Sequence, residues 1–138
     1  MTDAPAPFRV LLADDEEIIL HSLSELLKES GFDVVGAAAD GREAVSMAER
    51  LHPDVVVADL RMPGLTGLEV ATALRESRPE VPVIILSAYD DVGLQLAAER
   101  IPVAAYLVKG CSSREIFAAI RNAAMSAVPA APAPWAGL

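Results

Sequence analysis

The sequence predicts an α/β protein, because short apolar stretches rich in β-branched residues alternate along it with helical patterns. The apolar stretches lie at residues 8–13, 32–38, 55–58, 81–86 and 103–108. Such near-continuous apolar runs are typical of parallel strands buried on both faces. Right-handed crossovers leave few topologies for five such strands. We therefore predict a flavodoxin-like, doubly wound parallel sheet with strand order 2-1-3-4-5 and five helices.

Each predicted strand is followed by apolar residues at helical spacing. In the first helix these residues recur from Ile18 to Leu27, and Gly31 follows as the residue type common just past a helix end. The second helix begins after Asp40 and is closed by Pro53. Three more helices are expected over residues 68–77, more weakly from about 92 to 100, and over 113–127.

Length and composition indicate one globular domain. The chain has 138 residues, of which 53% are hydrophobic and 22% charged. We expect a disordered N-terminus over residues 1–7, a folded domain over 8–127, and a linker or tail rich in Pro and Ala over 128–138. The sequence has neither a signal-peptide pattern nor an apolar run of membrane-spanning length, so a cytoplasmic location is expected.

The charge balance narrows the classes of partner. A net charge of -9 and a pI of about 4.6 argue against nucleic acid or an anionic membrane as a ligand of this domain, whereas clustered carboxylates suit a divalent cation. The single cysteine, Cys111, excludes an internal disulfide. Its place beside Lys109 allows a tuned thiol, but a small residue near a helix start is the preferred interpretation. His21 and His52 are expected to be surface or capping residues.

Polar side chains follow the predicted strands at one edge of the sheet. Asp14 and Asp15 come after the first strand, Asp59 after the third, Ser87 after the fourth and Lys109 after the fifth. Each could serve alone as a cap, a turn residue or a solvated strand end. Because the carboxyl ends of parallel strands share one edge, their joint occurrence instead predicts a site at the topological switch point.

These residue types fit phosphoryl transfer to Asp59. Three carboxylates held together repel one another and need a cation, and oxygen ligands suit Mg²⁺. Lys109 offers a compact positive charge to a phosphoryl oxygen, and the hydroxyl of Ser87 can donate a hydrogen bond to another. Helix N-termini at the same edge favour the added anion.

Four segments resemble the receiver domain of two-component response regulators: LLADDEE, ADLRMPGLTGLE, VIILSAYD and AYLVKG. The resemblance spans residues 8–124 and its combined motif is specific. It implies a signalling phosphoacceptor, not a separate enzyme, which takes a phosphoryl group from a histidine kinase with Mg²⁺ and assists only its own phosphorylation and dephosphorylation. A homodimer on phosphorylation and control of transcription through a further domain are also implied.

The resemblance assigns a role to each matching position. Asp59 looks like the phosphoacceptor, Asp14 and Asp15 like the acidic pair that holds magnesium, and Asp15 like its direct ligand. The backbone carbonyl of Arg61 would complete the protein's share of the coordination.

Three further positions concern signalling. Lys109 matches the phosphate-sensing lysine, Ser87 the switch hydroxyl and Tyr106 the switch aromatic, which together would alter the face formed by helix four, strand five and helix five. Gly110 departs from the proline that commonly follows the lysine, a variant familiar among regulators with a C-terminal helix-turn-helix domain. The segment before Tyr106 also lacks the family's usual glycines.

Four rival interpretations fit less well. A flavodoxin-like electron carrier needs a hydroxyl-rich phosphate loop where this chain has ADDEE. A haloacid-dehalogenase-type phosphatase needs a second Asp where this chain has Arg61. An NTPase needs a Gly-x-x-x-x-Gly-Lys-Ser/Thr pattern, which the sequence lacks. A degenerate receiver that acts only as a binding module would lack some of the chemical positions, which are all filled here.

Overall fold

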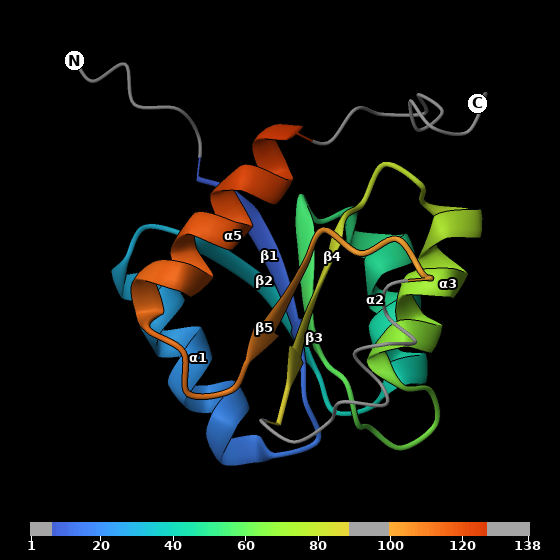
Figure 1. Ribbon diagram of the computed structural model, residues 1–138, viewed down its shortest axis with the longest axis horizontal. Coiled ribbons are helices and arrows are strands. Elements are labelled where there is room, and N and C mark those ends of the chain that lie inside the picture. The colour runs from blue at the N-terminus through green and yellow to red at the C-terminus, as the bar shows by residue number, and fades with distance from the viewer. Residues whose placement is uncertain (1–6, 89–99, 127–138) are drawn as a thin grey trace.

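The computed structural model describes residues 7–88 and 100–126 and contains one five-stranded parallel sheet (Figure 1). The strand order is β2-β1-β3-β4-β5, which confirms the predicted topology. The strands are β1 (Arg9–Ala13), β2 (Asp33–Ala38), β3 (Val55–Asp59), β4 (Val83–Ser87) and β5 (Ala105–Val108). Every pairing in the sheet is parallel, as expected when helices connect successive strands.

Helices cover both faces of the sheet. In Figure 1, α1 and α5 lie on one face, and α2 and α3 lie on the other. Their bounds are α1 (Glu17–Glu29), α2 (Gly41–Leu51), α3 (Gly67–Ser77) and α5 (Ser113–Ser126). The helix predicted between residues 92 and 100 lies almost wholly outside the described residues. No helix in the described ranges is both long and apolar enough to cross a membrane.

The strands divide their side chains between two cores because successive residues of a strand point to opposite faces. The core toward α2 and α3 contains Leu11, Val56 and Ile85. The core toward α1 and α5 contains their strand neighbours, such as Val57 and Ile84. All five residues of β3 are buried, so this strand has no polar position before its last residue, Asp59.

Local signals fix where the helices begin and end. The side chain of Asp40 accepts a hydrogen bond from the backbone N–H of Glu43 at the start of α2. Thr66 and Glu69 form a reciprocal capping box at the start of α3. His52 closes α2 with a left-handed backbone (φ 50°) and is exposed, which agrees with the surface or capping role expected for it.

Gly67 holds the beginning of α3 close to the end of β3. Its backbone N–H donates to the carbonyl oxygen of Leu60 at 2.9 Å. A Cβ atom at this position would lie 2.6 Å from the backbone oxygen of Asp59 and 3.0 Å from Cδ1 of Ile85. Only a residue without a side chain therefore allows α3 to approach the end of β3 this closely.

We predict that Gly67→Ala lowers the free energy of unfolding by about 1–3 kcal/mol, because the added methyl group overpacks against backbone atoms that cannot move independently. Urea unfolding measures the change. Glu76→Ala, at an exposed position of the same helix, is the matched control and should have little effect. Equal stability of the two variants would contradict the close approach.

Candidate phosphoryl-acceptor site

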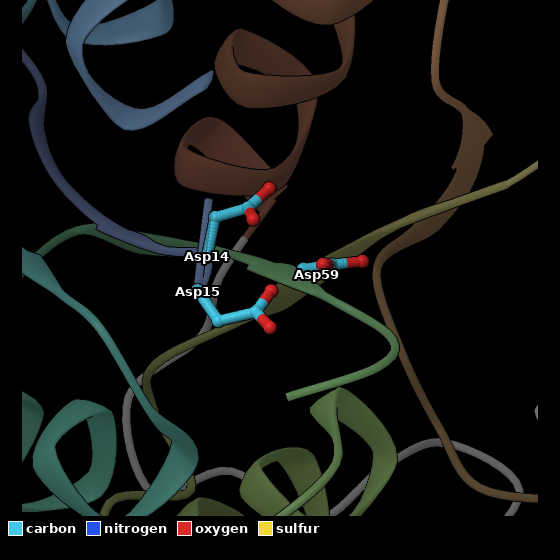
Figure 2. A group of neighbouring side chains, drawn as sticks. All are labelled: Asp14, Asp15 and Asp59. Carbon is cyan, nitrogen blue, oxygen red and sulfur yellow. The ribbon is translucent and has the colours of Figure 1, made fainter. Parts of the chain in front are cut away.

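Three carboxylates gather at the carboxyl edge of the sheet (Figure 2). Asp14 and Asp15 follow β1 directly, and Asp59 is the last residue of β3. One oxygen from each carboxylate lies within 4.8 Å of the other two. Asp14 and Asp59 are buried, whereas Asp15 is exposed. The structure therefore brings together the three acidic residues that the sequence placed at one edge.

Lys109, the residue directly after β5, contacts this cluster. Its Nζ lies 3.0 Å from Oδ2 of Asp59 and 3.2 Å from Oδ2 of Asp14. It also lies 3.6 Å from Oε1 of Glu16, which is more exposed. One ammonium thus faces the carboxylates of two buried residues and one surface residue, and charge-assisted contacts of this length are strong in a partly buried setting.

Backbone hydrogen bonds that continue the sheet past its strands set the positions of these side chains. The N–H of Lys109 donates to the carbonyl of Ser87 at 2.7 Å, and the N–H of Asp14 donates to the carbonyl of Ala38 at 3.0 Å. These bonds keep Asp14 and Lys109 in the register of the sheet although neither residue belongs to a strand. Hydrogen-bonded backbone therefore holds both residues in place at the edge of the sheet.

The electrostatics of the site are dominated by excess negative charge in a partly desolvated place. Burial raises the pKa of Asp59 above its usual value, and Asp14 adds to that rise, while the hydrogen bond from Lys109 opposes it. Burial alone would lower the pKa of Lys109, but its hydrogen bonds and attraction to Asp59 and Asp14 outweigh this and raise it. One lysine does not offset the carboxylates, so the cluster can accommodate a further cation.

The other predicted site residues lie around this centre. Ser87 is fully buried, and its hydroxyl donates to the carbonyl of Ala88 at 3.1 Å. The backbone N–H of Arg61 donates to Oδ1 of Asp59 at 3.4 Å. Tyr106 packs against the core toward α2 and α3, and its buried hydroxyl has no hydrogen-bond partner in the described structure.

Two features near the site were missed by the sequence reasoning. The carboxylate of Glu16 approaches Lys109, and the backbone N–H of the same residue donates to Oδ1 of Asp14 at 2.9 Å. Beside Lys109, an apolar pocket of about 290 Å³ opens between α1 and α5. Ile18, which is 82% exposed, contributes to the lining of this pocket. The only sequence signal for the contacts of Glu16 was its position in the acidic run ADDEE. Helical spacing gave no signal for the pocket beside Lys109.

The residues just after Lys109 have a structural role. Gly110 has φ +96°, which favours glycine, and no peptide bond of the described residues is cis. Burial raises the pKa of the Cys111 thiol, and Glu115 adds to the rise. A raised pKa disfavours the thiolate, which is the opposite of what a tuned nucleophile requires.

Comparison with known proteins agrees with this geometry. The sequence model of the response regulator receiver domain matches residues 10–121. The chain belongs to this family. The signal receiver domain of the putative response regulator NarL from Mycobacterium tuberculosis superimposes with a TM-score of 0.83 at 31% identity, covering 88% of this chain and 99% of that one.

Several curated relatives of this receiver domain are named as transcriptional regulatory proteins. It is 40% identical over 121 residues to the transcriptional regulatory protein PdtaR of Mycobacterium tuberculosis. The aligned region covers 88% of this chain and 58% of PdtaR. It is 37% identical over 118 residues to the alkaline phosphatase synthesis transcriptional regulatory protein PhoP of Bacillus subtilis. This aligned region covers 82% of this chain and 47% of PhoP. The chain therefore spans about half the length of these relatives.

Proposed function

We propose that this receiver domain accepts a phosphoryl group on Asp59 from a sensor histidine kinase in the cytoplasm. The observation that supports it is the contact between the Lys109 ammonium and the buried Asp59 carboxylate, 3.0 Å apart, beside two further carboxylates. A buried carboxylate at a strand end, paired with one lysine and bordered by excess negative charge, is suited to a reaction that adds a phosphoryl anion together with a metal cation.

The transfer exchanges one bond for another. An oxygen of the Asp59 carboxylate attacks phosphorus, the bond between phosphorus and the imidazole nitrogen of the kinase histidine breaks, and that nitrogen retains the electron pair. Lys109, released from direct pairing with Asp59, would bind an oxygen of the phosphoryl group. The hydroxyl of Ser87 would donate to another oxygen. The domain would thus assist its own phosphorylation and the later hydrolysis, and catalyse no other reaction.

The three clustered carboxylates fit Mg²⁺, because they offer only oxygen ligands and exceed the charge that Lys109 supplies. Asp14, Asp15 and Asp59, with the backbone carbonyl of Arg61, would hold the ion. Bound there, it would offset the negative charge of the transferring phosphoryl oxygens.

The kinase would approach over α1 and α5. The apolar pocket at their junction is lined by Lys109 itself, so a partner seated there lies next to the acceptor site. Ile18 offers this partner an exposed apolar contact at the start of α1.

The proposed switch starts at Ser87. If the phosphoryl group takes the Ser87 hydroxyl, the carbonyl of Ala88 loses its present donor and the loop after β4 can move. The hydroxyl of Tyr106, which is buried and has no hydrogen-bond partner among the described residues, is the second group that the switch would involve. A charge-assisted bond worth about 1.5–3 kcal/mol is enough to shift a two-state balance by one or two orders of magnitude.

The switch would be read on the face that includes β5 and α5, as a homodimer contact or as a contact with an output domain. Because the curated relatives are named as transcriptional regulators and are about twice as long, we propose transcription as the output. The net charge of -9 argues that nucleic acid would be bound by another domain and not by this one.

We predict that acetyl phosphate with Mg²⁺ adds one phosphoryl group to the wild type, measured as intact mass. Asp59→Asn should abolish the addition, because an amide cannot act as the nucleophile. Asp54→Asn, at the opposite end of the same strand, is the matched control and should be phosphorylated normally. Full phosphorylation of Asp59→Asn at another residue would contradict the assignment.

We predict that Mg²⁺ raises the melting temperature, with a stabilisation of about 2.7 kcal/mol at a hundredfold excess over its dissociation constant. Asp15→Asn should lose most of this increase while being more stable without metal, because removal of one charge relieves repulsion in the cluster. Asp33→Asn, an exposed carboxylate on β2, should respond to Mg²⁺ as the wild type does. An equal Mg²⁺ response in Asp15→Asn and the wild type would exclude this role.

We predict that beryllofluoride, a phosphoryl mimic, changes the NMR signals of the Tyr106 ring in the wild type but not in Ser87→Ala. The variant should still bind the mimic at Asp59 and lose only the transmission. Ser77→Ala is the control, because the hydroxyl of Ser77 also donates to a backbone carbonyl, that of Ala73 at 3.2 Å, but lies on the surface. A Tyr106 response of normal size in Ser87→Ala would show that the signal takes another route.

A further inference from the structure

A second apolar groove lies at the edge of the sheet between β5 and α5, apart from the acceptor site. Its volume is about 590 Å³, and it is hollow because alanines line it where larger side chains would fill the space. Ala104 and Ala105 contribute from the strand side, and Ala118, Ala119 and Ala123 from the helix. Its lining runs from Glu115, in the first turn of α5, to Ser126, the last residue of that helix.

β5 is an edge strand of four residues, AYLV, without a charged side chain. Natural sheets avoid unwanted pairing at such edges by placing charges there or by covering the edge with another segment. The groove also exposes apolar surface to water beside this edge, which favours an occupant with apolar side chains.

We propose that the chain's own C-terminal segment, residues 127–138, occupies the groove between β5 and α5. This segment, AVPAAPAPWAGL, follows Ser126 directly, so it begins where the groove ends. It has no charged residue in a chain of net charge -9, and its prolines favour an extended conformation that loses little entropy on binding. The inference does not depend on phosphorylation of Asp59.

The lengths allow this return path. α5 has 14 residues and therefore spans about 21 Å at 1.5 Å per residue. The nine residues from 127 to 135 reach about 28 Å in a polyproline conformation at 3.1 Å per residue. After a short turn at Ser126, Trp135 can thus reach any part of the groove as far as Glu115.

A tethered segment also has an advantage over a second copy of the chain. Its effective concentration at the groove is in the millimolar range because it is linked directly to α5. Two copies of an acidic domain repel each other, whereas the uncharged segment meets no such repulsion. When it is bound, the segment would block the β5–α5 face to other partners.

Trp135 is the only tryptophan of the chain, so tryptophan fluorescence reports on this segment alone. We expect the emission maximum of Trp135 to lie at a shorter wavelength in the native protein than in urea. Quenching of this emission by acrylamide should be severalfold slower in the native protein than in urea. Ala118→Glu places a charge in the groove at an exposed helical position and should return both values to those of an exposed indole. Ala124→Glu, on the same helix but outside the lining, should behave as the wild type.

Both variants are measured where thermal melts show them folded. An indole as exposed in the native protein as in urea would overturn the proposal, as would protection that survives Ala118→Glu. Protection that disappears on dilution would assign the groove to a second copy and overturn the intramolecular contact. None of these outcomes bears on whether Asp59 accepts a phosphoryl group, because the experiment contains no phosphodonor.

Discussion

The contact of Lys109 with Asp59 and Asp14 is the interaction on which the arrangement of the molecule depends. It joins the ends of β1, β3 and β5, which lie apart in the sequence and are not all neighbours in the sheet. A buried carboxylate is costly unless it is paired, and β3 is buried along its whole length up to Asp59. The lysine therefore permits a fully apolar central strand to end in a charged group without exposing that strand to water.

The same contact leaves the site with more negative than positive charge. Lys109 cannot offset every carboxylate near it, and burial raises the pKa of Asp59 in spite of the pairing. A structure selected only for stability would replace one of the carboxylates by an apolar residue of similar size, which often stabilises a protein. The retention of excess negative charge is thus better explained by a ligand that brings positive charge than by the needs of the fold.

The fold was predictable because each strand contains a short apolar run and several helices have a boundary signal at one end. Asp40 and Gly31 lie at or just past helix ends and marked those ends in the sequence, whereas the capping box of Thr66 at the start of α3 was not used to predict that helix. The gathering of Asp14, Asp59 and Lys109 followed from topology, since parallel strands share one carboxyl edge. For these residues, strand order alone determined which side chains meet.

Other features depend on distances that no sequence pattern encodes. The approach of Glu16 to Lys109 depends on how the first turn of α1 leaves β1. The pocket beside Ile18 depends on the spacing between two helices. Whether the Tyr106 hydroxyl finds a partner among the described residues depends on how the ring packs. Helical periodicity identifies which face of a helix is apolar but not whether a neighbour fills it, so it could not separate core positions from pocket walls.

The pocket between α1 and α5 and the groove between β5 and α5 differ in the residues that line them, and this difference gives them different proposed roles. The pocket shared with α1 contains Lys109 in its lining, so any occupant would lie next to the residue that contacts Asp59 and Asp14. The groove shared with β5 has five alanines in its lining, and none of the three clustered aspartates contributes to it. Occupation of the groove can therefore control access to the β5–α5 face without altering the charges that act on Asp59. If Asp59 accepts a phosphoryl group and the groove is occupied, as we propose, acceptance and readout would take place on different sides of α5 and would not compete for the same surface.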